Sequence, residues 1–283
     1  MDGKTVLVFG VTGRQGGAVA RHLHAKGWNV HGLTRDPSKP NAKKLEATGV
    51  ELVKGDLNDQ ESIQRAVKGA YGVFAVLNPR EVGHEGEIRQ AKGLVDCAKA
   101  AGIQHLVYSS GAGTAPNSGV PHIDGKAEIE AYVKASGLPW TIVRPVIFME
   151  NFLPSKQLIM AGVLLQAYWP DAKLQYIAVN DIGMLGAYVF ENQIRLGGKS
   201  FDIAGDEFTM TQAAETFTRV LGKPVRYVQQ SLDQIRSADP INARRLERVN
   251  NIGFEADIPT LRNWKPDMMT LEQWLRTSGF ANL

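Results

Sequence analysis

The stretch Val6–Gly17, "VLVFGVTGRQGG", decides the fold of this chain. Four apolar residues lead to Gly10, Gly13 and Gly16 at the spacing G-x-x-G-x-x-G, and "AVARHL" then continues with the period of a helix. In such a strand–turn–helix unit the first glycine allows a tight turn, the second lets backbone amides approach a pyrophosphate, and the third lets the helix pack on the strand. The amides at the helix N-terminus then face the phosphates. The stretch predicts the first unit of a dinucleotide-binding sheet; a glycine-rich turn that serves only packing is the alternative.

Short apolar runs alternate with longer segments of helical period from residue 4 to about residue 145. The runs are "TVLVFG", "NVHGLT", "VELVKG", "GVFAVL", "HLVYSS" and "WTIVRP". They are continuously apolar, which is typical of strands buried on both faces. This alternation predicts parallel strands joined by right-handed helical crossovers. We therefore expect an α/β fold with a Rossmann-type, doubly wound parallel sheet.

The pattern loosens after Pro145. A loop-rich region, "FMENFLPSKQLIMAGVLLQAYW", precedes a strand at "LQYIAV", a helix after Asp181 and a strand at "KSFDIAG". A helix at "TMTQAAETFTRVLG", a strand at "PVRYVQQ" and terminal helices ending in "TLEQWLRTSGF" follow. We expect residues 1–147 to form a dinucleotide-binding domain and residues 148–283 a smaller C-terminal α/β lobe that is partly interwoven with it.

The composition disfavours several other classes of protein. The 32 basic and 29 acidic residues are scattered, without the Lys/Arg clusters of a surface that follows a phosphate backbone, so direct nucleic-acid binding is not expected. The single cysteine, Cys97, excludes an intramolecular disulfide and a thiolate-rich metal site, and we interpret it as a packing residue. The apolar stretch "LIMAGVLLQAYW" is too short to span a membrane, and "MDGKTVLVFG" lacks the features of a signal peptide. We expect a cytoplasmic protein without metal or membrane association.

The end of the second predicted strand indicates which nucleotide binds. NAD sites place an acidic residue there, about 20 residues after the glycine loop, to bind the ribose 2′-hydroxyl. Here "GLTRDPSK" puts Thr34 and Arg35 at the strand end, and Arg14 lies within the glycine loop. Two guanidinium groups suit a 2′-phosphate, because their planar forks bind phosphate oxygens in pairs. NADP(H) is therefore the expected cofactor, and the preference would invert if Asp36 rather than Arg35 faced the ribose.

The next two strands end in further candidate contacts. "VKGDLND" places Asp56 and Leu57 at the end of the third strand, where folds of this kind cover the adenine. Asp56 can instead be the N-cap of the following helix. "VLNPRE" places Leu77, Asn78 and Pro79 at the end of the fourth strand, against the expected ribose and pyrophosphate.

The combination of "VFGVTGRQGG", "LTRDPSK", "GDLND", "HIDGK", "RPVIFMENF" and "TLEQWL" resembles the NmrA-like family of atypical short-chain dehydrogenases, and most of all its NADP(H)-sensing branch. Many families share the glycine loop, whereas "HIDGK" together with "MENF" is much more specific. The resemblance covers nearly the whole chain. It implies that the following residues contact the cofactor: Gly10, Val11, Thr12, Gly13, Arg14, Gln15, Gly16, Arg35, Asp56, Leu57, Leu77, Asn78, Pro79, Arg89, Lys126, Phe148, Met149, Glu150 and Asn151.

Two of these assignments have a specific basis in the resemblance. Arg89 corresponds to a lysine that reaches the cofactor in the sensing branch, across a small gap in the alignment. "FMEN" lies where the chain leaves the sixth strand, and there it either closes the nicotinamide pocket or only joins the two lobes.

The stretch "PHIDGKAEIE" departs from the pattern of ordinary short-chain reductases, in which Tyr-x-x-x-Lys supplies a proton-donating hydroxyl. His122 stands at the tyrosine spacing and Lys126 at the lysine, one turn apart on a predicted helix; Ser109 and Ser110 supply the serine position. A histidine can act as general acid or base near neutrality, although an ammonium beside it disfavours its protonated form. Lys126 can instead act alone, as in the related isoflavone-reductase group, or serve only to bind cofactor ribose hydroxyls.

The other nearby tyrosines are poor substitutes for the missing one. Tyr108 lies in a predicted strand, and Tyr132 follows Lys126 by six residues, on a different turn.

Two functions are compatible with this sequence. The first is an NADP(H)-binding redox sensor that changes its protein partners or its homodimeric state on cofactor binding, with at most weak reductase activity. The second is an NADPH-dependent reductase of quinones, enones or similar small electrophiles. The resemblance to a branch without the tyrosine favours the sensor.

Overall fold

The computed structural model describes residues 3–281, and the chain divides into two compact units. The first unit comprises Met1–Arg144 and Ile182–Phe201, and the second comprises Pro145–Asp181 and Asp202–Leu283. The chain thus leaves the first unit and returns to it once. Division at residue 147 into two functional domains stays a prediction. Among the described residues, no helix is long and apolar enough to cross a membrane.

A seven-stranded sheet in the order β10-β6-β5-β4-β1-β2-β3 forms the centre of the first unit. All pairings from β3 to β6 are parallel, which confirms the Rossmann-type α/β fold. The strand at "KSFDIAG", which the sequence pattern left outside the first sheet, is its seventh strand beside β6. The strands are β1 Thr5–Val8, β2 Asn29–Thr34, β3 Glu51–Lys54, β4 Gly72–Ala75, β5 His105–Ser109, β6 Trp140–Pro145 and β10 Ser200–Ile203.

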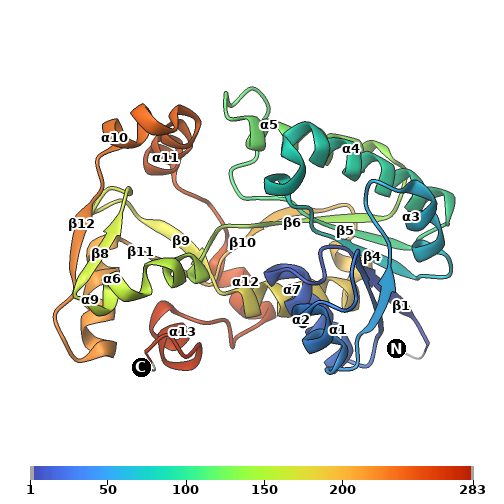
Figure 1. Ribbon diagram of the computed structural model, residues 1–283, viewed down its shortest axis with the longest axis horizontal. Coiled ribbons are helices and arrows are strands. Elements are labelled where there is room, and N and C mark those ends of the chain that lie inside the picture. Colours follow the sequence, from blue (N-terminus) through green and yellow to red (C-terminus); the bar gives the residue numbers. More distant parts are fainter. Residues whose placement is uncertain (1–2, 282–283) are drawn as a thin grey trace. The chain divides into compact units, whose positions relative to one another are not determined.

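Helices cover both faces of this sheet: α3, α4 and α5 lie on one face, and α1 and α7 on the other (Figure 1). Gly183 brings α7 close to α1, since a Cβ at that position would lie 2.7 Å from the backbone of Ala18. The helices are α1 Arg14–Ala25, α2 Pro40–Glu46, α3 Gln60–Val67, α4 Pro79–Ala100, α5 Pro121–Ala135, α7 Val179–Glu191 and α8 Gln193–Leu196.

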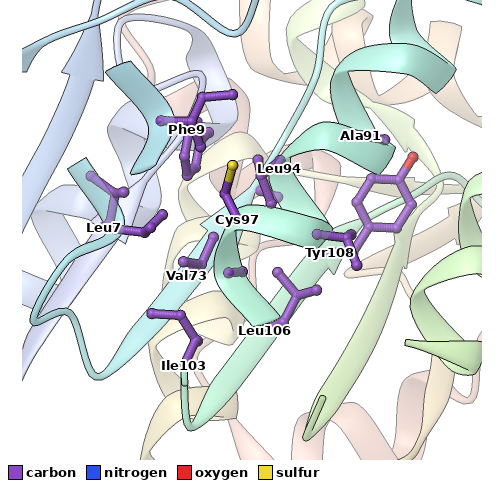
Figure 2. Packing of buried hydrophobic residues seen from close by; sticks show 14 of the residues in the cluster. Leu7, Phe9, Val73, Ala91, Leu94, Cys97, Ile103, Leu106 and Tyr108 are labelled. Atoms are coloured by element: carbon purple, nitrogen blue, oxygen red, sulfur yellow. The ribbon is translucent and has the colours of Figure 1, made fainter. Parts of the chain in front are cut away.

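The core between the sheet and α4 is built from the strand residues that the sequence predicted to be buried. Figure 2 shows Leu7, Val73 and Leu106 of three strands beside Leu94 and Cys97 of α4. Cys97 is buried in this cluster, and burial together with Asp96 raises the pKa of its thiol, which confirms the interpretation as a packing residue.

The second unit has its own core around two small sheets, one ordered β11-β9-β7 and one formed by β12 and β8. The region expected to be loop-rich contains three short elements, η1, α6 and β8. The elements are β7 Ile147–Phe148, η1 Met149–Ser155, α6 Lys156–Met160, β8 Val163–Gln166, β9 Leu174–Ile177, β11 Asp206–Phe208, α9 Met210–Leu221, β12 Arg226–Gln229, α10 Leu232–Ala238, α11 Pro240–Ile252, α12 Ile258–Trp264 and α13 Leu271–Thr277.

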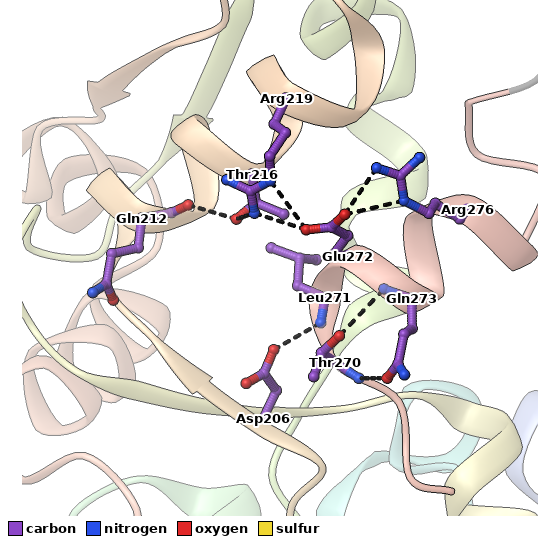
Figure 3. A network of polar contacts seen from close by, with 9 residues as sticks. All are labelled: Asp206, Gln212, Thr216, Arg219, Thr270, Leu271, Glu272, Gln273 and Arg276. Carbon is purple, nitrogen blue, oxygen red and sulfur yellow. Dashed lines mark hydrogen bonds and ion pairs between the residues drawn. The ribbon is translucent and has the colours of Figure 1, made fainter.

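The motif "TLEQWL" begins α13 and fixes it against α9 (Figure 3). The side chains of Thr270 and Gln273 form a capping box at the start of the helix. Glu272 accepts hydrogen bonds from Arg219 of α9 and from Arg276 of its own helix. The motif therefore has a structural explanation inside the second unit.

Candidate cofactor site

The glycine loop has the geometry of a phosphate cradle. Gly10 adopts φ 68°, and a Cβ there would lie 2.5 Å from the Val76 carbonyl oxygen. A Cβ on Gly16 would lie 2.3 Å from the Gly10 carbonyl oxygen. Helix α1 then begins at Arg14, and no side chain caps its N-terminus, whereas Asp59 caps α3. The loop therefore leaves the amides at the start of α1 available to a ligand's phosphates, so its residues fit a dinucleotide.

The remaining loop residues divide into anchors and exposed positions. The Ser109 hydroxyl at the end of β5 donates a hydrogen bond to Gln15 Oε1 at 2.8 Å, which ties the loop to the sheet. Val11 is buried and packs against Gly32 of β2. Thr12 and Arg14 are exposed.

Arg35 stands directly after β2, where the 2′-phosphate is expected. Its Nη2 lies 2.7 Å from Glu81 Oε2 of α4, and both side chains are about half exposed. Asp36 turns into its own loop: its Oδ1 accepts from the Ser38 hydroxyl at 2.5 Å and from the Ser38 amide at 2.9 Å. These bonds lower the pKa of Asp36. The expected preference for NADP(H) would invert if Asp36 rather than Arg35 faced the ribose. This geometry does not favour that arrangement.

The end of β3 differs in one respect from the sequence interpretation. Asp59, not Asp56, is the N-cap of α3, so that alternative for Asp56 is wrong. Asp56 Oδ1 instead accepts from the Asn58 amide at 2.9 Å and so holds the turn. Leu57 is half-buried and packs against the core of the first unit.

Asn78 and Pro79 form the start of α4, at the end of β4. Asn78 caps the helix by accepting from the Arg80 amide at 3.2 Å, and its side-chain amide donates to Glu81 Oε1, also at 3.2 Å. Leu77 is buried in the core, so only its backbone remains for a cofactor. The glycine loop, Arg35, Asp56 and Asn78 thus all follow the carboxyl ends of neighbouring parallel strands, the edge at which such sheets bind nucleotides.

Lys126 lies on α5 and runs past the loop after β5. A Cβ on Gly111 of that loop would lie 3.5 Å from Lys126 Cδ. The ammonium Nζ is 3.1 Å from Glu87 Oε1 of α4 and 5.7 Å from the centre of the Tyr108 ring. Burial acts to lower the pKa of Lys126, but the adjacent Tyr108 and the Glu87 carboxylate raise it, and the net shift is upward. Lys126 is therefore a charged donor at neutral pH.

Tyr108 is closer to Lys126 than its position in a strand suggested, yet it is not a substitute for the missing tyrosine. Burial raises its pKa to about 12, with the nearby Lys126 charge only partly opposing this. Tyr132 is accounted for elsewhere, since its hydroxyl donates to Asp96 at 2.7 Å. A hydroxyl with so high a pKa is a poor proton donor near neutrality.

His122 and Lys126 share one helix, as predicted, with Pro121 in the first turn. The His122 ring lies 6.1 Å from the ring of His84 on α4, measured between ring centres. The tyrosine position is thus occupied by one member of a histidine pair that bridges α4 and α5.

Below Lys126 on the same helix, Glu130 forms a second buried ion pair. Its carboxylate accepts from Arg144 Nε at 2.7 Å and from Arg144 Nη2 at 2.5 Å, and Lys134 adds a bond of 3.2 Å. Burial acts to raise the pKa of Glu130, but these hydrogen bonds lower it further than burial raises it. The pair fastens α5 to β6.

Arg89 is exposed on α4, beyond the break in that helix at Gly83. Its role at the cofactor stays a prediction.

Residues 148–151 belong to the second unit and have structural partners there. Met149 is in the core, and Asn151 is exposed. Both oxygens of Glu150 accept from the Val179 amide, and Oε1 also accepts from Trp274 Nε1 at 3.0 Å. The predicted contact of residues 148–151 with a cofactor stays a prediction.

Sequence reasoning missed two carboxylates, Glu81 and Glu87. For Glu87 a signal existed: Gly86, Glu87, Ala91 and Leu94 follow the helical period of the buried face of α4. A glutamate on such a face must find a positive partner. Glu81 has no comparable signal, since an acidic residue in the first turn of a helix is ordinary.

A parallel sheet with a glycine cradle at its carboxyl edge defines a Rossmann-type dinucleotide-binding fold. The chain belongs to the NmrA-like family, whose sequence model matches residues 2–253.

One relative and two solved proteins of the same fold illustrate what this chain is similar to. A NAD(P)H azoreductase of Xenophilus azovorans is 32% identical over 243 residues, which cover 82% of this chain and 79% of the azoreductase. The NADPH-dependent quinone oxidoreductase QOR2 of Escherichia coli, solved with NADPH, superposes with a TM-score of 0.82 at 24% identity and covers 96% and 98% of the two chains. NmrA, a negative transcriptional regulator, has been solved with NADP and with NAD; each structure gives a TM-score of 0.80 at 23% identity, over 98% and 95% of the chains. Reductases and a regulator thus share this fold.

Proposed function

We propose that this protein binds NADP(H) at the carboxyl edge of its parallel sheet. The glycine cradle carries the proposal, because neither Gly10 nor Gly16 has room for a Cβ and the start of α1 has no side-chain cap. Gly10 to Gly16 would hold the pyrophosphate, Arg35 the 2′-phosphate, and Asn78 and Lys126 the ribose hydroxyls. The bound nicotinamide would supply hydride chemistry. The solved neighbours that contain NADP(H) support this assignment.

Preference for NADPH over NADH is assigned to Arg35. Fluorescence titration of wild type should give tighter binding of NADPH than of NADH. Arg35→Ala should weaken NADPH binding by about tenfold or more, the magnitude of a charge-assisted phosphate contact, and leave NADH binding unchanged. Arg65→Ala, which removes an exposed arginine from α3, is the matched control. Equal or tighter NADH binding by wild type would contradict the preference.

We infer that the bound nucleotide serves as a redox signal in the cytoplasm and that any reductase activity is weak. Lys126 is flanked by Glu87 and Tyr108, and the tyrosine spacing is held by His122. The nearby Tyr108 hydroxyl, with a pKa of about 12, is a poor acid. Such a site binds a nicotinamide nucleotide more readily than it delivers a proton. The signal would pass to a regulatory protein partner or through the homodimeric state.

A dedicated reductase is the second candidate, and two observations favour it. The azoreductase relative shows that members of the family reduce small acceptors. The His84–His122 pair offers a group other than tyrosine for proton transfer. A quinone, enone or azo acceptor takes a hydride at one atom and a proton, from a histidine or from water, at another, so the reaction does not require a tyrosine.

Turnover distinguishes the two candidates. NADPH oxidation is followed by absorbance with a panel of quinones, enones, aldehydes and azo compounds. Tight NADPH binding without turnover, together with a different oligomeric state or protein partner under NADP and NADPH, supports the sensor. Turnover that is lost in Lys126→Ala or His122→Phe supports the reductase.

A further inference from the structure

Lys126 is held by a residue of another helix. Its Nζ lies 3.1 Å from Glu87 Oε1, and only 17% of the Lys126 side chain and 1% of the Glu87 side chain are exposed. Lys92 and Glu128 form another ion pair between α4 and α5, at 2.8 Å, but their side chains are 39% and 51% exposed. In the first pair the lysine is on α5 and the glutamate on α4, whereas in the second pair the lysine is on α4 and the glutamate on α5. The first pair is in the interior and the second is at the surface.

The carboxylate of Glu87 is incompletely bonded. Its Oε2 has no hydrogen-bond partner among the described residues. Such an atom is unusual, because buried polar groups in proteins are nearly always paired.

Stability alone is a poor explanation for this arrangement. A buried ion pair often contributes little, because removing both charges from water offsets their attraction, and apolar side chains of similar size do as well. Several hydrogen bonds compensate the buried charge of the Glu130 carboxylate. Glu87 lacks this compensation, because its Oε2 has no partner among the described residues. The pair is therefore better explained by what it does to Lys126.

The effect on Lys126 has a charge component and a position component. Without a negative neighbour, burial would favour the neutral amine. With Glu87 and Tyr108 beside it, the pKa of Lys126 instead lies above its usual 10.5. One N–H of the ammonium is directed to Glu87, and the Tyr108 hydroxyl is a second hydrogen-bond neighbour, which leaves at least one of the three N–H groups beside the loop after β5.

We propose that Glu87 is the positioning residue of Lys126: it keeps the lysine charged and fixes the ammonium at the end of β5, where the cofactor then meets it. The cofactor part rests on the proposed function, whereas the control of Lys126 by Glu87 does not. Other titratable groups around this pair are His84 on α4, Tyr108 on β5, and His122 and Glu130 on α5. Glu130 is occupied by Arg144 of β6.

The first test measures the charge of Lys126 without cofactor. In protein with lysines labelled at the ε-carbon, NMR follows the Lys126 signal with pH, and Lys126→Arg identifies that signal. Wild type and Glu128→Gln should stay charged throughout the range in which the protein is folded. Glu87→Gln should lose the charge about one pH unit or more earlier than wild type. An unchanged titration in Glu87→Gln overturns the proposal.

The second test is the pH dependence of NADPH affinity. Near neutral pH, Glu87→Gln should bind within about fivefold of wild type, and the affinity should fall about tenfold or more as its Lys126 loses the proton. Glu128→Gln should follow the wild-type profile. A parallel, pH-independent loss in Glu87→Gln would indicate a merely structural role and overturn the proposal. If wild type itself does not bind NADPH, the proposed function fails, while the titration of Lys126 still decides the role of Glu87.

Glu87→Asp covers the case in which Glu87→Gln does not fold. The shorter carboxylate keeps the charge but draws the ammonium away. NADPH affinity should then fall at every pH without a change in the Lys126 titration. An affinity equal to that of wild type overturns the positioning role.

Discussion

Glu130 and Glu87 are two buried carboxylates on the same side of the first sheet, and they differ in how many hydrogen bonds compensate their charge. Glu130 receives three hydrogen bonds from Arg144 and Lys134. Glu87 receives one, from Lys126, and its second oxygen has no partner within residues 3–281. Glu130 thus connects α5 to β6. At Glu87, one carboxylate oxygen remains unbonded beside Lys126, a predicted cofactor contact.

The second unit contains a similar contrast. Glu150 accepts bonds from the Val179 amide and from Trp274. Asp181 accepts one bond, from the Met269 amide at 2.8 Å, and its Oδ1 has no partner in the described part of the chain. Burial alone therefore does not indicate the role of a carboxylate. The hydrogen-bond partners of each of its two oxygens must also be known.

The largest effect is expected for Glu130→Ala. Removing the carboxylate deprives the largely buried Arg144 of its two hydrogen bonds to Glu130, which should cost about 3 kcal/mol or more in the free energy of unfolding. Because hydrogen bonds lower the pKa of Glu130, the wild-type contribution should be lost as the pH falls below its ordinary value of 4.5. Urea unfolding at neutral and acid pH measures both. A loss that persists unchanged in acid would contradict the assignment.

Asp181→Asn should act in the opposite direction. Burial raises the pKa of Asp181 to about 6, so the folded protein loses stability as the pH rises from about 4 to about 6. The variant removes this loss and keeps an acceptor for the Met269 amide. It should be more stable than wild type near neutrality by up to about 3 kcal/mol, since one pKa unit corresponds to about 1.4 kcal/mol.

Asp206→Asn is the matched control for that change. Its Oδ2 accepts from the Leu271 amide at 2.7 Å (Figure 3). Its Oδ1 accepts from the Glu207 amide at 2.9 Å, and an asparagine can replace only one of these two acceptors. Thermal unfolding at two pH values compares the variants. Equal stabilisation by both would show that bonding of the second oxygen is irrelevant.

A smaller effect is expected for Tyr108→Phe. The hydroxyl makes no short hydrogen bond among the described residues but lies beside the Lys126 ammonium, so its removal should change the free energy of unfolding by no more than about 1 kcal/mol. Tyr227→Phe, which removes a hydroxyl that donates to the Gln166 carbonyl at 3.0 Å, should be destabilising. Chemical denaturation of the pair tests the distinction, and a costly Tyr108→Phe would refute it.

The smallest effect is expected at the exposed pair of Arg35 and Glu81. Exposed ion pairs are weak, so Glu81→Gln should leave stability unchanged and should free Arg35 for the 2′-phosphate. NADPH affinity should rise about two- to fivefold, with no change for NADH. Glu46→Gln, which breaks the exposed pair with Lys43, is the control. Weaker NADPH binding in Glu81→Gln would show instead that Glu81 orients Arg35.

The fold could be predicted because its signals are local in sequence. Each buried strand is a continuous apolar run, and the glycine spacing of the first loop is explained by contacts over a few residues, such as Gly16 against Gly10. The predicted second and sixth strands coincide with Asn29–Thr34 and Trp140–Pro145. β10 could not be placed in the first sheet in this way, because the alternation of strands and helices ends at Pro145 and the segment Pro145–Asp181 of the second unit precedes it.

The candidate site was only partly predictable, for the same reason. The residues after each strand could be named from the sequence, since parallel strands end at one edge. The partners of Lys126 could not, because Glu87, Tyr108 and Lys126 come from three elements. The sequence makes Tyr108 a poor substitute for the missing tyrosine because it lies in a strand, and it does not show that the ring lies 5.7 Å from Lys126 Nζ.

The burial of Cys97 has a practical consequence for studying this protein. It is the only cysteine of the chain, it lies in the core beside Leu94, and burial makes its thiolate unfavourable. A thiol reagent should therefore not modify Cys97 in the folded wild-type protein. A cysteine introduced at an exposed position, such as Thr12 in the glycine loop, would then be a single attachment point for a dye, and the cofactor site could be observed without removing the native cysteine.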